Sequence, residues 1–259
     1  MRPLTGSTRP ACSKILLSGL RLDCSRLFTL YLVGTFGSFV GKPVFVEGGV
    51  EKYILFGLNY DAIFALKGQG VKDLQILDDT REGLPGWDAV TELSGEAKVI
   101  CGVCSSAQAR RRAVEKITRL LERSSLKWEW ATVVSPTAIV ADTARMGRGV
   151  LVSDGAFIGE EAELRDFAAI LPAARVHHEV VVGPCSVIVS GAQVLGRVTL
   201  GEAVYICANA VVLPDSEVGA ESTVGANVVV GNVRPGRCLC APAPRDITRL
   251  RQKVEQKPR

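Results

Sequence analysis

The side chains best suited to proton transfer lie together at one point of the chain. Its only two histidines, His177 and His178, are adjacent, and Glu179 follows them directly. Histidine accepts a proton near neutral pH, and a neighbouring carboxylate raises its basicity and fixes its tautomer. Because the surrounding sequence is built largely of Val, Ala and Gly, its composition gives no packing reason for two adjacent histidines. The pattern predicts a general base, and adjacency alone leaves open which histidine it is.

The element that carries this triplet is set by a six-residue period. From Val134 to Val230 every sixth residue, seventeen in succession, is large and apolar, and the residue four positions later is small or β-branched. Helices place apolar contacts three and four residues apart and regular strands alternate every two, so neither explains the period. A Gly often follows the large apolar residue. We interpret the pattern as a solenoid of short strands, in which these glycines supply the positive φ that tight corners need.

The same period predicts which side chains point inward. The large residues and the small residues four positions later fill the interior, so the hexapeptide beginning at Val176 buries Val176 and Val180. The residues between them are His177, His178 and Glu179. We therefore expect the triplet on a corner or outer face of the solenoid, where a substrate can reach it.

The chain divides into four segments by composition and pattern. Residues 51–130 alternate short apolar segments with segments of helical spacing, which is typical of a small parallel sheet of Rossmann type. The predicted strands cover residues 52–57, 74–79 and 99–102, and the predicted helices cover residues 60–68 and 107–123. The solenoid follows at 131–240, and residues 241–259 form a basic tail. Residues 1–50 are interpreted as a disordered or misassigned extension, with a transit peptide as the alternative.

The turn after the first predicted strand has two interpretations. Nucleotide-binding turns at this place use several glycines, so that backbone N–H groups approach a phosphate. Here only Gly57 is present, and Asp61 brings a negative charge to the same turn. Asp78 and Asp79 end the next strand about twenty residues later, where they would meet a base or ribose hydroxyl, or cap the following turn. A nucleotide site and a purely structural turn both stay open.

Charge and composition exclude several classes of partner. Residues 1–50 hold six basic and two acidic side chains, which accounts for the whole net charge of +4. The remaining chain is balanced and offers no basic patch for a nucleic acid. The apolar stretch at 27–40 is too short to span a membrane. The eight cysteines show no repeated ligand spacing, so we expect reduced thiols and a cytoplasmic protein.

The span from Lys52 to about Arg245 resembles the hexapeptide-repeat sugar acetyltransferases that carry a small N-terminal Rossmann-like domain. These are of the sialic-acid O-acetyltransferase and UDP-4-amino-sugar N-acetyltransferase type. The matching segments are residues 53–57, 77–79, 100–102, 135–140, 178–183 and 209–214. The resemblance implies an α/β half-Rossmann domain followed by a left-handed parallel β-helix, with three hexapeptides in each coil. It also implies a homotrimer, because coenzyme A in such proteins lies between two prisms.

The resemblance further implies the chemistry and the residues that perform it. It implies direct acetyl transfer from acetyl-CoA, without a metal, to an amino or hydroxyl group of a nucleotide-linked sugar. His178 becomes the general base, and Glu179 becomes the carboxylate that orients it. The residues implied to line the CoA arm are Gly196, Ala208, Gly225 and Ala226. The residues implied to bind the acceptor are Gly57, Asn59, Tyr60, Asp61, Asp78 and Asp79.

The sequence departs from the family pattern at the acceptor end. Asn59-Tyr60-Asp61 stands where the family has Gly-Gly-His, and Leu171 stands where it often has Asn. A γ-type carbonic anhydrase uses the same prism, but its zinc requires three separated histidines, and this chain has two adjacent ones. The remaining alternative is a non-catalytic trimeric β-helix scaffold, or a CoA-binding protein that has lost the nucleotide-sugar site. Binding of CoA without acetyl transfer would distinguish that alternative.

Overall fold

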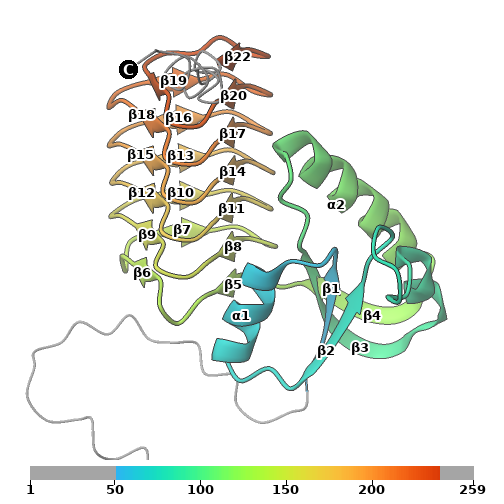
Figure 1. Ribbon diagram of the computed structural model, residues 1–259. Helices are drawn as coiled ribbons and strands as arrows, with labels where there is room; N and C mark the ends of the chain where they lie inside the picture. Colours follow the sequence, from blue (N-terminus) through green and yellow to red (C-terminus); the bar gives the residue numbers. More distant parts are fainter. Residues whose placement is uncertain (1–50, 240–259) are drawn as a thin grey trace, which may run out of the picture. The chain divides into compact units, whose positions relative to one another are not determined.

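The computed structural model describes residues 51–239. The predicted extension at 1–50 and the predicted tail at 241–259 lie outside the described residues. All described residues belong to one compact unit, in which an α/β part is followed by a β-helix of stacked coils (Figure 1). Between residues 51 and 239 no helix has the length and apolar character needed to cross a membrane.

The α/β part is a parallel four-stranded sheet with helices. Its elements are β1 Lys52–Phe56, α1 Tyr60–Gly68, β2 Asp73–Leu77, the 3₁₀ helix η2 Trp87–Glu92, β3 Ser94–Cys101, α2 Ala107–Leu121 and β4 Ser125–Trp130. The strand order is β2-β1-β3-β4, with every pairing parallel. The side chains of Asn59 and Ser106 cap α1 and α2 by accepting hydrogen bonds from the first-turn N–H groups of Ala62 and Ala109.

The predicted α/β elements are present, but β3 begins five residues earlier than predicted, and the strand β4 and the 3₁₀ helix η2 were not predicted. Sequence reasoning missed β4, although Leu126, Trp128 and Trp130 alternate with polar residues as a strand requires. The Trp130 ring packs edge-on against Phe167 of the β-helix, with ring centroids 5.0 Å apart. Strand β4 therefore both completes the sheet and joins it to the solenoid.

The β-helix is built from two-residue strands separated by turns. In chain order the strands are β5 Val133–Val134, β6 Ile139–Val140, β7 Arg145–Met146, β8 Leu151–Val152, β9 Phe157–Ile158, β10 Glu163–Leu164, β11 Ala169–Ile170, β12 Arg175–Val176, β13 Val181–Val182, β14 Val187–Ile188, β15 Gln193–Val194, β16 Thr199–Leu200, β17 Tyr205–Ile206, β18 Val211–Val212, β19 Glu217–Val218, β20 Thr223–Val224, β21 Val229–Val230 and β22 Cys238–Leu239. Each strand from β5 to β18 pairs in parallel with the strand eighteen residues later, as Ile170 pairs with Ile188, and β20 pairs with β22 fifteen residues later.

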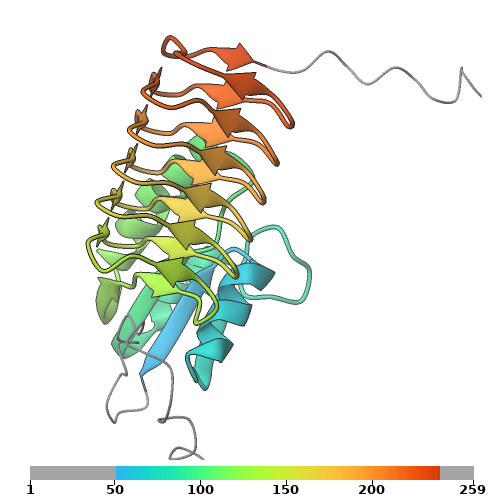
Figure 2. The ribbon, with the colours of Figure 1, turned by 90° about the vertical axis from the view of Figure 1, so that its left-hand side faces the viewer.

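This pairing produces three sheets that run along the stack of coils (Figure 2). Sheet I contains β5, β8, β11, β14, β17, β20 and β22. Sheet II contains β6, β9, β12, β15, β18 and β21, and sheet III contains β7, β10, β13, β16 and β19. The turns that connect them form three corners, which we name I–II, II–III and III–I after the sheets they join.

The predicted interior of the solenoid is confirmed. From Val152 to Val230 every large residue of the six-residue period is buried, and the small residues between them complete one continuous apolar core. Burial of apolar surface stabilises the fold by about 25 cal/mol per Å², so this column of side chains is the main source of stability for the coils.

The predicted use of glycine at the corners is wrong. The glycines that follow the large residues do not have positive φ; the left-handed conformation occurs two residues later, at residues such as Glu161, Glu179 and Asp215. Most of these glycines are needed because the coils approach closely: a Cβ on Gly183 would lie 2.2 Å from the carbonyl oxygen of Gly201 in the next coil, whereas Gly231 has more space. Contact between coils, and not backbone freedom, selects glycine at that position.

The outer face of sheet I is covered by the α/β part. Leu151, Ala169 and Val187 of this face are fully buried, in one apolar cluster with side chains of β1 and α1 such as Leu55 and Leu66. Without the α/β part, this face of sheet I would expose a continuous apolar surface to water. The contact therefore explains why these outward-facing residues are apolar.

Arg110 of α2 joins the two parts although its side chain is completely buried. Its guanidinium donates to the carbonyl oxygens of Cys101, the last residue of β3, at 2.8 Å and of Val103, just after the strand, at 3.1 Å. It also donates to the carbonyl oxygens of Phe167 at 2.6 Å and Gly149 at 3.3 Å, which lie at corner III–I. Carbonyl acceptors from both parts thus replace the water that the buried cation has lost.

Replacement of Arg110 by Met should destabilise the protein by about 3 kcal/mol, because several buried carbonyl groups lose their donors together. The free energy of unfolding in urea, followed by circular dichroism on the full chain, measures this loss. Arg112→Met, at an exposed position on the same helix, is the matched control. Equal denaturation midpoints for the Arg110 variant and the wild type would show that the guanidinium does not join the parts.

Candidate active site

The predicted triplet forms the turn between β12 and β13, at corner II–III. Glu179 has the left-handed conformation with φ of 58°, and its N–H donates to the carbonyl of Glu160 in the preceding coil at 2.8 Å. This turn directs His178 and Glu179 to solvent, with 49% and 51% of their side-chain surfaces exposed. The prediction that the triplet lies at a corner is confirmed.

His178 and Glu179 are hydrogen-bonded to each other. The Nδ1 atom of His178 lies 3.0 Å from Oε1 of Glu179. An ionised carboxylate only accepts hydrogen bonds, so the proton of the neutral imidazole resides on Nδ1. The Nε2 atom then carries the lone pair and can accept a proton from a bound group.

The Nε2 atom of His178 lies directly against Gly196 of the next coil. A Cβ built on Gly196 would be 2.5 Å from both Nε2 and Cε1 of the imidazole. Gly196 is eighteen residues after His178, so the pairing of coils brings the two residues together at corner II–III. Only glycine leaves space for the ring in this position.

Two further charged residues extend this corner. Arg197 and Asp215 occupy the same left-handed position as Glu179 in the next two coils. Their side chains form a double hydrogen bond, with Nε–Oδ1 at 2.6 Å and Nη2–Oδ2 at 2.9 Å. The bond from Arg197 lowers the pKa of Asp215. Sequence reasoning missed this pair, and the eighteen-residue spacing from Glu179 was the signal that could have found it.

His177 has a different environment from its neighbour. Its ring packs against Phe157 with ring centroids 5.9 Å apart, and its buried Nε2 atom has no hydrogen-bond partner among the described residues. Burial, followed by the nearby Arg175 and His178, lowers the pKa of His177. The structure thus separates the two histidines: only His178 combines an exposed ring with a carboxylate partner.

The residues predicted to line the CoA arm do not lie together within a single chain. Gly196 lies with His178 at corner II–III, whereas Ala208, Gly225 and Ala226 lie at corner I–II in later coils. Ala208 is half-buried, Gly225 is buried and Ala226 is exposed. A single prism therefore presents these residues on two different edges.

The predicted acceptor residues of the first turn lie in the α/β part. Gly57 follows β1 with φ of 84°, and Asn59 caps α1 and donates from Nδ2 to the carbonyl of Gly102 at 2.8 Å. Tyr60 is 71% exposed at the start of α1. Burial and then the nearby Asp154 raise the pKa of Asp61.

The predicted acidic pair at the end of β2 is engaged within the protein. Asp78 is 6% exposed and accepts hydrogen bonds from the Leu58 N–H at 2.6 Å and from the Thr80 hydroxyl and N–H at 2.6 and 2.7 Å. Asp79 accepts from Lys116 at 2.6 Å and from the Trp87 N–H at 2.7 Å. Both carboxylates hold neighbouring segments in place.

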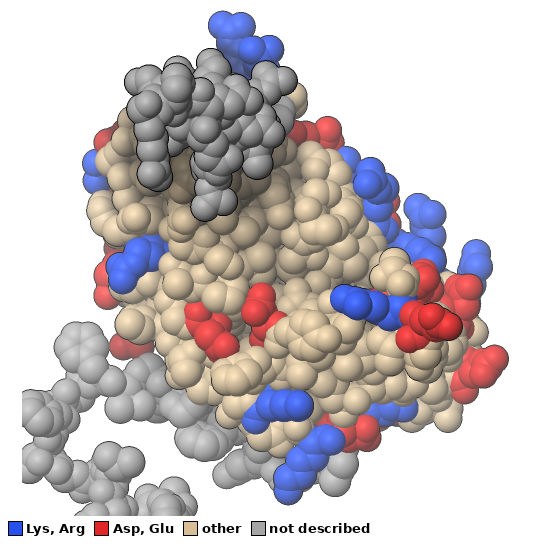
Figure 3. Space-filling model, in the orientation of Figure 1, with Lys and Arg blue, Asp and Glu red and all other residues tan. Residues whose placement is uncertain are grey.

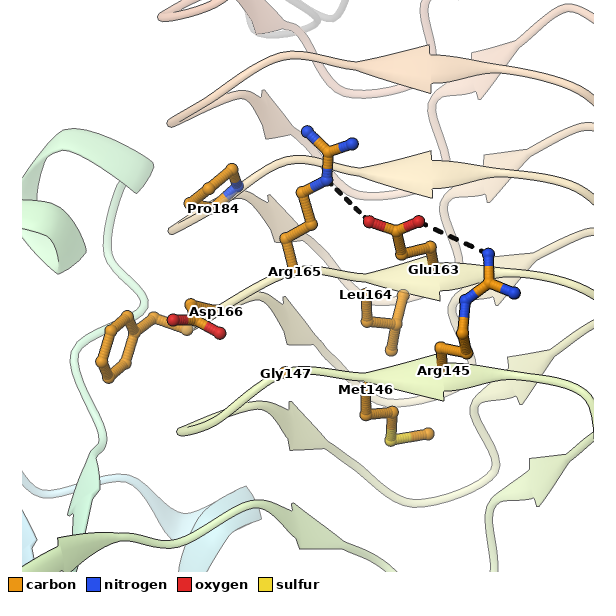
Figure 4. A pocket seen from close by; sticks show the side chains of 9 residues that line it. Arg145, Met146, Gly147, Glu163, Leu164, Arg165, Asp166 and Pro184 are labelled. Carbon is orange, nitrogen blue, oxygen red and sulfur yellow. Dashed lines mark hydrogen bonds and ion pairs between the residues drawn. The ribbon is translucent and has the colours of Figure 1, made fainter.

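A hollow of about 680 Å³ lies on the surface around sheet III (Figure 4). The carboxylate of Glu163 lies between the guanidinium groups of Arg165 at 2.8 Å and Arg145 at 3.5 Å, so it offsets part of their positive charge. The hollow is lined by residues 145–147, 163–167 and 184, which include none of the predicted site residues. Among residues 51–239 no group of three or more His, Cys, Asp or Glu side chains is placed to hold a metal ion.

Part of the solenoid sequence matches a known protein family. Residues 197–232 match the family described as bacterial transferase hexapeptide (six repeats). No curated protein sequence matches the chain.

Solved structures share the fold over most of its length. PerB from Caulobacter crescentus, in complex with CoA and GDP-perosamine, is 22% identical with a TM-score of 0.63, covering 74% of this chain and 95% of that one. The acetyltransferase domain of PglB from Neisseria gonorrhoeae, with acetyl coenzyme A, is 22% identical with a TM-score of 0.65, covering 74% and 97%. WeeI from Acinetobacter baumannii is 17% identical with a TM-score of 0.51 over the same shares. The predicted fold, an α/β part followed by a left-handed parallel β-helix of hexapeptide repeats, is confirmed.

Replacement of Asp78 by Asn should lower the free energy of unfolding by about 2 kcal/mol at pH 7, because a charged acceptor of three hydrogen bonds is lost. Burial disfavours the ionised carboxyl, but the bonds from Thr80 and Leu58 outweigh it and lower the pKa of Asp78. A lowered pKa stabilises the fold above the unfolded value of about 3.9, and this contribution disappears as the pH falls through the folded value.

Urea unfolding at several pH values tests this expectation. The difference between the wild type and Asp78→Asn should be full at neutral pH and shrink below about pH 4. Asp73→Asn, at an exposed position of β2, is the matched control. A difference that is independent of pH would contradict the role of the ionised carboxyl.

Proposed function

We propose that the protein is an acyltransferase that moves the acetyl group of acetyl-CoA to an amino or hydroxyl group of a sugar. The observation that carries the proposal is the exposed His178–Glu179 pair against Gly196, with the Nδ1–Oε1 distance of 3.0 Å. The fold supports it, because PerB and the PglB domain, which share it, are structures with CoA or acetyl coenzyme A bound.

The proposed reaction is a direct transfer without an enzyme-bound acetyl group. The acceptor nitrogen or oxygen attacks the thioester carbonyl carbon while Nε2 of His178 removes its proton. The carbon–sulfur bond then breaks, and the CoA thiolate leaves with the proton that the imidazolium returns. Glu179 keeps Nδ1 protonated and stabilises the imidazolium while it exists.

Gly196 has two proposed roles in this reaction. Its missing side chain leaves space for the imidazole and for the thioester beside it. Backbone N–H groups around Gly196 would then stabilise the oxyanion that develops on the thioester carbonyl, and such donors provide much of the rate enhancement in acyl transfer.

The proposed CoA site requires more than one copy of the chain. Gly196 and the group Ala208, Gly225 and Ala226 lie on different corners, so a cofactor that contacts both corners lies between two prisms. Apolar residues on and beside sheet II are exposed in the single chain, with Ile139 at 64%, Val229 at 61% and Leu213 at 43%. We therefore propose a homotrimer, in which a neighbouring prism covers such residues.

We place the protein in the cytoplasm, where acetyl-CoA is available. Cys101, Cys104 and Cys185 are free thiols, as a reducing compartment favours. Burial raises the pKa of Cys104 and of Cys185 to about 11, so neither thiol supplies a nucleophile for a covalent mechanism.

Replacement of His178 by Ala should lower kcat by about a hundredfold or more, because general-base catalysis contributes about 10² to 10⁴ in rate. Glu179→Gln should cost less, since the base itself remains. Thiol release from acetyl-CoA, measured against a panel of sugar acceptors, gives kcat for each variant.

His177→Gln is the matched control, because its ring packs on Phe157 and has no carboxylate partner. It should retain activity within about threefold of the wild type. Near wild-type turnover by His178→Ala would exclude it as the base. CoA-dependent thermal stabilisation without thiol release from any acceptor would favour the scaffold alternative.

Replacement of Gly196 by Ala should lower kcat by about tenfold or more while leaving the fold intact, because a methyl group 2.5 Å from the imidazole displaces the ring. Gly231→Ala is the matched control: its nearest atom, Oγ of Ser216, is 3.8 Å away, which is an ordinary contact. Melting temperature and kcat measured on both variants separate a loss of folding from a displaced base. Equal activity of the two variants would contradict the proposed position of His178.

A further inference from the structure

We infer that the acceptor is a sugar without a nucleoside diphosphate, because the chain itself fills the place where its α/β part would bind one. In a parallel sheet with strand order β2-β1-β3-β4, the crevice for such a ligand lies at the carboxyl ends of β1 and β3, where the strand order reverses. A phosphate at this place needs unpaired N–H groups at the start of the following helix and no nearby anion. The inference concerns the substrate of the proposed acetyltransferase and rests on that function.

An internal carboxylate already occupies the phosphate-binding turn. The Leu58 N–H, the first after Gly57, donates to Asp78 Oδ2 at 2.6 Å. The Ala62 N–H in the first turn of α1 donates to Asn59 Oδ1 at 2.9 Å. These donors are the kind that a phosphate would use, so the side chains of Asp78 and Asn59 stand in its place.

The crevice between β1 and β3 is filled by side chains. Asn59 crosses it and donates to the carbonyl of Gly102 at 2.8 Å. A Cβ on Gly102 would lie 2.4 Å from the Gly57 carbonyl oxygen, and a Cβ on Gly57 would lie 3.1 Å from the Val103 side chain. The segments after the two strands are therefore in contact, and a diphosphate cannot enter without displacing Asn59.

The charges around the turn also oppose a diphosphate. Asp61 lies in the first turn of α1, and Asp154 of the β-helix is close enough to raise its pKa together with burial. On the face in Figure 3, acidic side chains stand in an otherwise uncharged surface over the first coils, without Lys or Arg beside them. Two cations near the turn are already engaged: Lys116 pairs with Asp79 at 2.6 Å, and Arg110 donates to buried carbonyl groups. The exposed Arg81 acts on Asp78 itself, whose pKa it helps to lower.

The acids that would recognise a base or ribose are engaged as well. Asp78 holds the turn after β1, and Asp79 holds Lys116 and the Trp87 N–H. The α/β part therefore supports sheet I of the β-helix and does not recognise the acceptor. The acceptor is selected at corner II–III by its sugar ring and its amino or hydroxyl group.

Binding of nucleotides to the full-length protein tests the inference directly. UDP, GDP and dTDP at about 1 mM should leave the melting temperature within about 1 °C, whereas CoA should raise it, because a ligand stabilises only the state that it binds. The nucleotides are also added in the presence of saturating CoA, so that binding in the CoA site is not counted. A saturable stabilisation by any of the three on top of saturating CoA would overturn the inference.

Kinetics with paired acceptors provides the second readout. Thiol release from acetyl-CoA is compared for a free amino sugar and for the same sugar linked to UDP, GDP or dTDP. The free sugar should have a kcat/KM no lower than the linked one, and a preference of more than about tenfold for a linked sugar would contradict the inference. The absence of thiol release from every acceptor, with no CoA-dependent stabilisation, refutes the transferase proposal, while the nucleotide titration still decides the inference.

Discussion

The stacking of coils eighteen residues apart is the constraint on which the β-helix and its candidate site depend. Two-residue strands have no stability alone, and they persist because each pairs with the strands above and below it around a shared apolar core. The close approach of the coils selects glycine at Gly183 and Gly201 and places Gly196 under the ring of His178. The same repeat brings Glu179, Arg197 and Asp215 into one column at corner II–III.

The second constraint is the buried joint between the two parts. Arg110 satisfies carbonyl groups at the end of β3 and others at corner III–I, and among residues 51–239 it has no carboxylate partner. The joint and the apolar contacts on sheet I leave corner II–III uncovered. The α/β part thus protects one face of the solenoid while the proposed chemistry takes place at an edge that it does not reach.

The internal hydrogen bonds of the α/β part change the interpretation of its sequence. Asp78 and Asn59 look like ligand-binding residues because they stand at strand ends beside a turn. In the structure their side chains bond to Leu58, Ala62 and Gly102, which are the groups a ligand would otherwise meet. A carboxylate at a strand end can therefore bind the N–H groups of the neighbouring turn itself, so its presence in the sequence does not show that the turn binds a ligand.

The sequence alone determined the solenoid, because a six-residue period of large and small apolar residues can be buried only by short strands that repeat in register. It also identified the His177–His178–Glu179 corner and most of the strands and helices before it, although it missed β4 and η2. It could not determine why glycine recurs, since that depends on the distance between coils, as at Gly183. Nor could it separate His178 from His177, or reveal the roles of Arg110 and Asp78. Those properties depend on which groups lie within hydrogen-bond distance of one another. Such groups can be far apart in the sequence, as Arg110 and Phe167 are, at fifty-seven positions. Only the tertiary structure brings such residues together.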